Sequence, residues 1–146
     1  MDDDATEYVI SERDSILKRI EETRTAIHEA RESGDWSEVP DDVYRKLLEK
    51  IELSTLPSVH GRSISGVMGI VSAEVLCRVN LHGDPTNAEE QLQQVSSETL
   101  EKLRARALRV NADAVVDVRT AHNLVDLDDD HHRFLIVSSG TAVSLN

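Results

Sequence analysis

The sequence predicts an α+β domain in residues 51–146, with a helical segment in front of it. Near Ile51 the spacing of apolar residues changes from the threes and fours of a helix to strand-like runs. Beyond that point, one long segment of helical spacing, residues 88–110, separates two pairs of strand-like runs. The predicted order is therefore strand, strand, helix, strand, strand, with one helix on a four-stranded sheet.

The helical segment opens with an acidic stretch, residues 1–10, which lacks periodicity and is expected to be a frayed end. Ser11 and Asp14 fit the cap of a first helix, and Gly34 fits its left-handed end. The apolar residues of this helix lie at spacings of four and three: Ile16, Ile20, Thr23, Ile27 and Ala30. This narrow stripe indicates packing on the neighbouring domain or, alternatively, self-association as a short coiled coil.

A second short helix is expected to begin near Pro40. Proline is tolerated in a first turn, and the following Asp41 and Asp42 match the positive end of the helix dipole. The apolar side of this helix is formed by Val43, Leu47, Leu48 and Ile51. Residues 1–50 are therefore expected to be an acidic tail followed by a helical hairpin.

The first two strands are predicted at residues 53–56, where Pro57 ends the run, and at residues 64–79. Gly66 and Gly69 interrupt the longer strand and are expected to form bulges or a bend. Apolar residues occupy both faces of this strand. We therefore expect it to be covered on both sides, by the N-terminal helices or by another subunit.

The helix at 88–110 is expected to end at Asn111, a residue suited to a left-handed stop. A strand at 114–120 follows, then a polar hairpin loop at 126–132 and a last strand at 134–145. The middle of the last strand has small side chains around Gly140, which predicts a close approach of another backbone or subunit.

The composition excludes some classes of function. The formal net charge of −12 disfavours nucleic acid as a partner, and Arg104, Arg106 and Arg109 fit a solvated helix face. The longest apolar run is too short and too interrupted to span a membrane. Cys77 is the single cysteine, which, with a start unlike a signal peptide, indicates the cytoplasm. Such acidity occurs in ordinary acidic proteins and also in halophiles.

Three segments together carry a resemblance to a known family. They are Gly-Ile-Val-Ser-Ala-Glu-Val at 69–75, Asn-Ala-Asp-Ala-Val-Val-Asp-Val at 111–118 and Ser-Ser-Gly-Thr-Ala-Val at 138–143. In this order and at these separations they resemble the YbjQ-like family, which is named for heavy-metal binding. The resemblance covers residues 51–146 and leaves residues 1–50 outside it.

The resemblance implies a dodecin-like subunit in a homo-oligomeric ring, typically a pentamer, whose biochemical role is poorly defined. The chain departs from the family pattern in two loops. A short loop at 81–85 replaces a longer insert before the helix, and residues 128–132 replace a glycine-rich hairpin. Functions that depend on either loop are therefore not implied for this chain.

The densest group of potential metal ligands is Asp128-Asp129-Asp130-His131-His132. Imidazole with carboxylate suits a divalent transition metal, so Asp130, His131 and His132 are the candidate ligands. Adjacent residues of one loop cannot all turn toward one ion, and His122 across the predicted hairpin could complete the site. The alternative is a solvated turn between two strands.

Two further side chains invite a chemical interpretation. Cys77 with His82 could form a thiol–imidazole pair, but a small buried thiol in an apolar strand explains Cys77 more simply. Glu74 lies within the same apolar strand and should be paired, interfacial or shifted in pKa. Arg78, Arg119 or another subunit could pair it, and an interface ion pair is preferred to catalysis.

The sequence therefore predicts a non-enzymatic homo-oligomer that binds a metal or small ligand or acts as a scaffold. The alternative is an adaptor whose residues 11–51 recruit a protein partner to the ring. An enzyme with its site between subunits has the least support, because the sequence places no second acid–base group beside Glu74.

Overall fold

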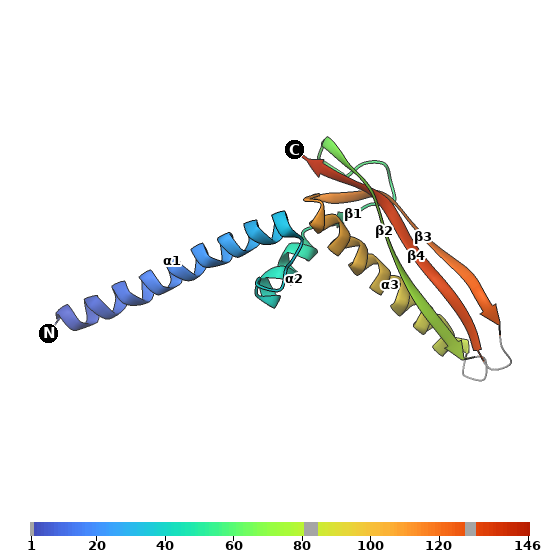
Figure 1. Ribbon diagram of the computed structural model, residues 1–146, viewed down its shortest axis with the longest axis horizontal. Coiled ribbons are helices and arrows are strands. Elements are labelled where there is room, and N and C mark those ends of the chain that lie inside the picture. Colours follow the sequence, from blue (N-terminus) through green and yellow to red (C-terminus); the bar gives the residue numbers. More distant parts are fainter. Residues whose placement is uncertain (1, 81–84, 128–130) are drawn as a thin grey trace. The chain divides into compact units, whose positions relative to one another are not determined.

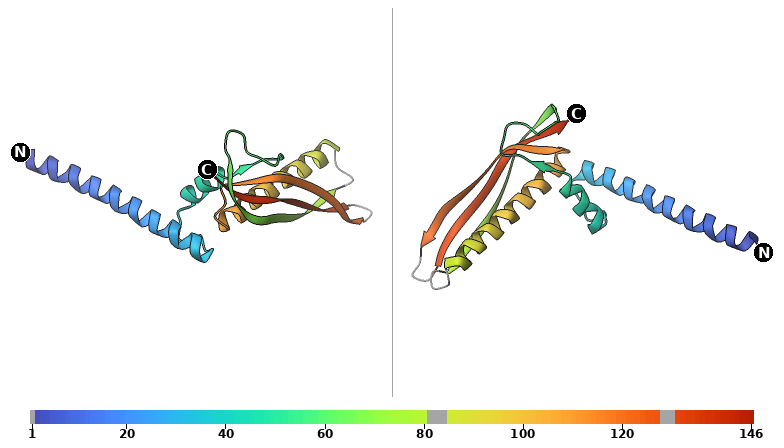
Figure 2. Two further views of the ribbon diagram at one scale, coloured as in Figure 1. Left: turned by 90° about the horizontal axis from the view of Figure 1, so that it is seen from above. Right: turned by 180° about the vertical axis from the view of Figure 1, so that it is seen from behind.

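The structure is a computed structural model that describes residues 2–80, 85–127 and 131–146 (Figures 1 and 2). The chain divides into two compact units, residues 1–45 and residues 46–146. The second unit therefore begins a few residues before the predicted boundary at residue 51, within the second helix. Each unit is described by itself.

Two helices account for the N-terminal region, as predicted. Helix α1 spans Asp2–Ser33, so the expected frayed end at residues 1–10 is wrong and the helix begins well before Ser11. Acidic residues at a helix start are favoured by the helix dipole, which the prediction overlooked. Gly34 ends α1 in the left-handed conformation, with its N–H bonded to the Ala30 carbonyl. Helix α2 spans Asp41–Glu49, close to the prediction.

The C-terminal unit is a four-stranded mixed sheet with one helix, which confirms the predicted α+β class and element order. The strands are β1 (Glu52–Leu53), β2 (Ile64–Asn80), β3 (Ala114–Leu127) and β4 (His131–Leu145). Their order in the sheet is β1-β3-β4-β2, with β1 parallel to β3 and the other pairs antiparallel. The expected likeness to dodecin subunits stays a prediction.

Helix α3 (Pro85–Arg109) lies along one face of this sheet and packs mainly against β2, less against β4 and β3 (Figure 1). Asn111 stops it at φ 58°, as predicted. The N–H groups of Asn111 and Ala112 donate to the carbonyls of Leu108 and Ala107, which is the Schellman arrangement. The Asp113 carboxylate then accepts the N–H of Leu145 at 2.9 Å. The segment Asn111–Asp113 therefore ties the end of α3 to β4.

Bulges shape the long strands. Register shifts in β2 lie at Gly66 and near Gly69, as expected. A third bulge in β3 places the non-glycine residue Asp117 at φ 53°. The segment after β1 stabilises this bulge: the N–H of Asp117 donates to the Leu56 carbonyl, and the N–H of Val118 donates to the Ser54 carbonyl. The regular alternation at 114–120 did not predict it.

The core of this unit lies on both sides of the sheet, at different ends. Under α3, Cys77, Val79 and Ile136 form one buried cluster. On the other face, Val59 covers a second cluster near the carboxyl end of β4: Ala114, Val116, Val143 and Leu145. Between these clusters Gly140 leaves no room for a side chain, since a Cβ would lie 2.5 Å from Val115 Cγ1. The predicted close approach is thus confirmed, within one chain.

The face of the sheet opposite α3 is largely open beyond the second cluster. Ile70 on β2 is 84% exposed and Leu76 is 55% exposed. Both alternate with residues that face α3, such as Ala73 and Cys77, which are buried. The expected cover for both faces of β2 is therefore absent from the described part of this unit.

Candidate functional site

The candidate metal ligands lie at the end of the sheet where β4 begins. His131 and His132 are the first residues of β4, so the predicted hairpin loop at 126–132 is too long on both sides. Pairing with Asn80 and Val79 on β2 draws these polar residues into the strand. Asp130 lies outside the described residues.

The two histidines face opposite sides of the sheet, because successive side chains alternate along a strand. His131 Nδ1 lies 3.2 Å from Arg78 Nη2. His132 instead packs edge-on against Phe134, with ring centroids 6.1 Å apart. Phe134 belongs to the cluster under α3, so His132 points toward the helix side. One ion cannot bind both imidazoles of one chain in this arrangement.

His122, the proposed additional ligand, is engaged elsewhere. Its Nε2 lies 3.0 Å from Ser96 Oγ on α3. Among the residues that the structure describes, no three His, Cys, Asp or Glu side chains come together as a metal site. The metal site at Asp130, His131 and His132 therefore stays a prediction.

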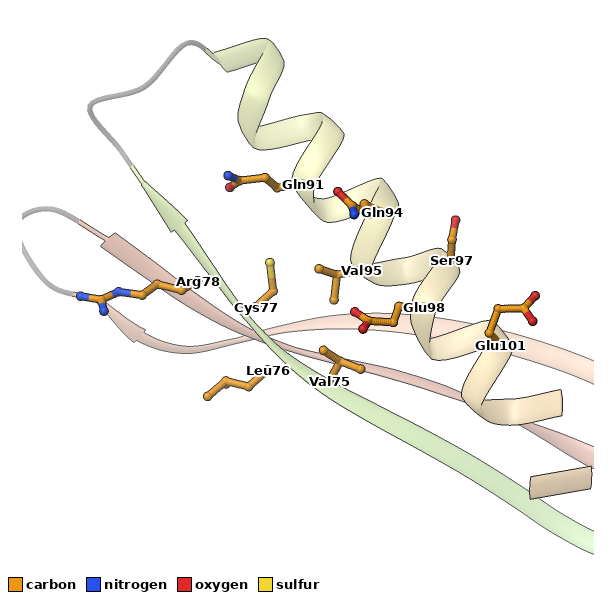
Figure 3. Close-up of a pocket in the computed structure, with 10 residues that line it drawn as sticks. All are labelled: Val75, Leu76, Cys77, Arg78, Gln91, Gln94, Val95, Ser97, Glu98 and Glu101. Atoms are coloured by element: carbon orange, nitrogen blue, oxygen red, sulfur yellow. The ribbon is translucent and has the colours of Figure 1, made fainter. Parts of the chain in front are cut away.

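A cleft of about 570 Å³ separates the edge of β2 from α3. We call it the β2–α3 cleft; Figure 3 shows its β2 and α3 side chains. Those of β2 are Val75, Leu76, Cys77 and Arg78, and those of α3 are Gln91, Gln94, Val95, Ser97, Glu98 and Glu101. The sulfur of Cys77 points toward α3 (Figure 3).

Cys77 is 5% exposed, as the simpler interpretation predicted. Burial, assisted by the Glu98 carboxylate, raises the pKa of its thiol. The described lining contains no histidine or lysine that could activate the sulfur. His82, the proposed partner, lies outside the described residues. The cleft therefore lacks the features of a cysteine nucleophile site.

A second cleft of about 430 Å³ continues along the same edge of β2. Its lining combines Ser72, Ala73 and Glu74 of β2 with Lys102, Arg106 and Arg109 of α3. Glu74 is exposed and lacks an ion-pair partner within the described chain, and so does Arg119 on β3. The expectation that Glu74 pairs across an interface stays a prediction.

Sequence reasoning missed a buried hydroxyl network between α3 and the sheet. Ser138 Oγ lies 2.9 Å from both Thr99 Oγ1 and Thr120 Oγ1, and Thr99 donates to the Ser96 carbonyl at 2.6 Å. Thr99 and Ser138 are fully buried. Thr99 lies at helical spacing from the apolar Val95 and Leu103, so this polar residue among apolar ones was the available signal.

The neighbouring Ser96 and His122 have the spacing of a nucleophile and a base, but not the proton arrangement. Ser96 Oγ donates its hydrogen to the Leu92 carbonyl at 2.8 Å. This bond uses the single hydroxyl hydrogen of Ser96, whereas the role of His122 Nε2 as donor or acceptor depends on its tautomer. This pair fastens β3 to α3.

Comparison with known proteins places the C-terminal unit in a family. A family model described as "Putative heavy-metal-binding" matches residues 51–146, about two thirds of the chain. The chain belongs to this YbjQ family. Its three characteristic segments include Asn111, Asp113 and Gly140, which have the structural roles given above. The family description says nothing about residues 1–50, which lie outside the match.

Relatives agree with this assignment. A protein named UPF0145 from Bifidobacterium longum subsp. infantis is 31% identical over 108 residues, covering 66% of this chain and 96% of the relative. Another UPF0145 protein, from Picosynechococcus sp., is 29% identical, with coverage of 64% and 97%. The YbjQ family region thus corresponds to nearly the whole length of these relatives.

A solved structure supports the fold. A DUF74 family protein of unknown function from Pediococcus pentosaceus matches with a TM-score of 0.50 at 16% identity, covering 66% of this chain and 98% of that one. Among the described residues, no helix has the length and apolarity needed to cross a membrane.

Proposed function

We propose that this YbjQ family protein is a subunit of a homo-oligomeric ring that binds or scaffolds rather than catalyses. One observation carries the proposal: β2 presents large apolar side chains on the open face of the sheet, with Ile70 84% exposed. Apolar surface of this kind on a long strand favours burial against another molecule. A second copy of the chain is the simplest partner, because every molecule in solution can serve as one. Rings are a common closed arrangement of identical subunits.

The chemistry of the described side chains supports a binding role over catalysis. Burial raises the pKa of the Cys77 thiol, which favours the protonated form over the reactive thiolate. The Ser96 hydroxyl donates to the Leu92 carbonyl within α3, so its single hydrogen is engaged away from His122. Neither group therefore offers an activated nucleophile.

Light scattering coupled to size-exclusion chromatography tests the oligomer. We expect the mass at micromolar concentration to be a multiple of the 16.3 kDa of one chain. A monomer under these conditions would refute the proposal. The value of the multiple distinguishes a pentamer from other rings.

Metal binding is the ligand class that the family description suggests. Because His131 and His132 face opposite sides of the strand, a site using either would need ligands from the neighbouring loop or another subunit. Histidine ligands must be deprotonated to bind a metal, so zinc or nickel affinity should weaken at acidic pH.

Calorimetry on the parent and on His131→Ala/His132→Ala, each at low and high salt, tests this site. If the histidines are ligands, the double variant loses binding while the oligomer persists. If binding is unchanged in the double variant and disappears at high salt, only the acidic surface attracts the ion.

An adaptor role is a second candidate, and α1 favours it. Ile16, Leu17 and Ile20 are each about half exposed on this 32-residue helix. Such a stripe is suited to docking on a groove or another helix. Deleting residues 1–50 tests the idea: an adaptor keeps its oligomer, because that region lies outside the YbjQ family match, and loses its partner.

A further inference from the structure

The sheet has two unpaired edges on opposite sides, and both are long. β2 is an outer strand of 17 residues whose neighbour in the described sheet is β4 alone. On the opposite side, β1 covers β3 only at Ala114 and Val115, and the segment 54–56 reaches Val118. Beyond that point, residues 119–127 of β3 pair with β4 on one side and have no described strand on the other side. Unpaired backbone groups of this kind are a template for another strand.

Helix α3 is displaced toward the β2 edge. The β2 edge and the β3 edge therefore differ in shape, and the two shapes are complementary. The helix packs mainly on β2, so the β2–α3 cleft opens at the β2 edge. At the other edge, Leu124 is paired with Phe134 and therefore shares the face that carries α3. Leu124 nevertheless remains 51% exposed. One edge thus offers space under a helix, and the other offers an apolar side chain without a cover.

The charges on the opposite face are complementary as well. In the strand register, Glu74 of β2 lies beside Val137 of β4, and Arg119 of β3 lies beside Ser139 of β4. Val137 and Ser139 belong to the face of β4 opposite α3, so Glu74 and Arg119 share that face. Within one chain, β4 separates the two charged residues. Placing β3 of one copy beside β2 of another would bring these opposite charges to neighbouring strands, where such pairs are stabilising.

We propose that β3 of one subunit pairs with the edge of β2 in the next, so that Leu124 enters the neighbour's β2–α3 cleft. This deepens the proposed oligomer and rests on it. Because the contact joins two different surfaces, its repetition builds a ring when the rotation between neighbours closes, instead of a twofold dimer. Within one chain, β2 and β3 both run antiparallel to β4, so they run in the same direction. If the ring axis lies along the strands, β3 of one subunit therefore pairs in parallel with β2 of the next.

Two single variants, each blocking one edge, test this arrangement. Ile70→Lys places a charge on the β2 edge, and Leu124→Lys places one on the β3 edge; lysine is a natural block to edge pairing. Each variant alone should be monomeric by light scattering. Each retains one intact edge, so an equal mixture should form a 1:1 heterodimer of twice 16.3 kDa and nothing larger.

Val110→Lys is the matched control, because Val110 is also an exposed apolar residue but follows the end of α3 and belongs to neither β2 nor β3. It should keep the mass of the parent. Circular dichroism verifies that each variant is folded, and Ile70→Thr with Leu124→Thr repeats the experiment if a lysine variant unfolds.

The outcomes separate this inference from the proposed oligomer. A monomeric parent removes both. An oligomeric parent whose mass is unchanged in Ile70→Lys or Leu124→Lys overturns the edge pairing alone. Two monomeric variants that stay monomeric when mixed also overturn it, because that result indicates one self-complementary surface.

Discussion

The two faces of the YbjQ sheet are built from the same strands but differ in how far their side chains are buried. Beneath α3, Ile136 and Ser138 are fully buried, and the hydroxyl groups there are hydrogen-bonded to one another. On the opposite face of β2, Ile70 and Leu76 remain exposed. Helix α3 of the same chain buries one face. The other face also carries large apolar side chains, but no described element of this unit covers Ile70 and Leu76.

The difference shows that apolar residues on both faces of a strand predict burial but not what provides it. Helix α3 packs mainly on β2 and less on β4 and β3, all on one face of the sheet. A single helix has no means of covering the second face. The residual apolar surface then becomes available for association.

The largest expected effect compares one isoleucine on each face. Ile136→Ala should lower the free energy of unfolding by about 2–5 kcal/mol at every protein concentration, because it leaves a cavity. Ile70→Ala should change it by less than about 0.5 kcal/mol in the monomer, as exposed sites do. Urea unfolding across a range of protein concentrations measures both.

The concentration series sharpens the comparison. If Ile70 is buried between subunits, the loss in Ile70→Ala grows with protein concentration, since association stabilises only the parent. An Ile70→Ala loss that is large even at the highest dilution would contradict the description of an open face.

The next effect concerns the closed face at Gly140. A Cβ there would meet Val115 Cγ1 and the Val116 carbonyl oxygen at 2.5 and 2.8 Å. Gly140→Ala should therefore cost about 1–3 kcal/mol through overpacking. Gly66→Ala is the control, because its Cβ meets only the rotatable Ser144 hydroxyl at 2.9 Å. Equal melting temperatures for the two variants would argue against the close approach.

A smaller effect is expected in the hydroxyl network. Thr99→Val keeps the shape of the side chain and removes a hydroxyl group that bonds Ser138 and the Ser96 carbonyl, a loss of about 1 kcal/mol. Thr25→Val removes an equivalent hydroxyl bonded to Glu21 on an exposed part of α1 and should be nearly neutral. Thermal unfolding of the pair decides whether burial makes the difference.

The smallest effect is the pH dependence of Cys77. Its pKa is raised above the usual thiol value in the folded state, so folding favours the protonated form. The contribution to stability is present below the unfolded pKa of about 9 and is lost as the pH rises through the folded value. Alkylation should be several-fold slower in folded than in urea-unfolded protein at pH 8, measured by mass spectrometry. Equal rates would contradict a buried thiol.

Much of the fold followed from local chemistry. Gly34 and Asn111 have positive φ, as their residue types and positions at helix ends predicted. Gly140 is enclosed, as its small neighbours indicated. The two helix ends could be predicted because their constraint lies within a few residues of the chain.

Features fixed by distant contacts were not predictable in the same way. Asp117 adopts a left-handed conformation because the backbone at Leu56, far away in sequence, bonds to it. His131 and His132 look like loop residues by composition, yet pairing with β2 extends the strand through them. The metal hypothesis assumed a free loop, which is why it did not anticipate histidines on opposite faces.

The pairing of β2 also has a consequence for the newly synthesised chain. Within the described sheet, β2 has one strand partner, β4, and the ribosome makes β4 only after α3 and β3. During that interval a 17-residue strand rich in β-branched residues lacks its partner, and such segments aggregate readily. Glu74 and Arg78 are the charges within it, and they interrupt its apolar run. Besides any role in assembly, these two residues would then protect the nascent polypeptide until β4 arrives.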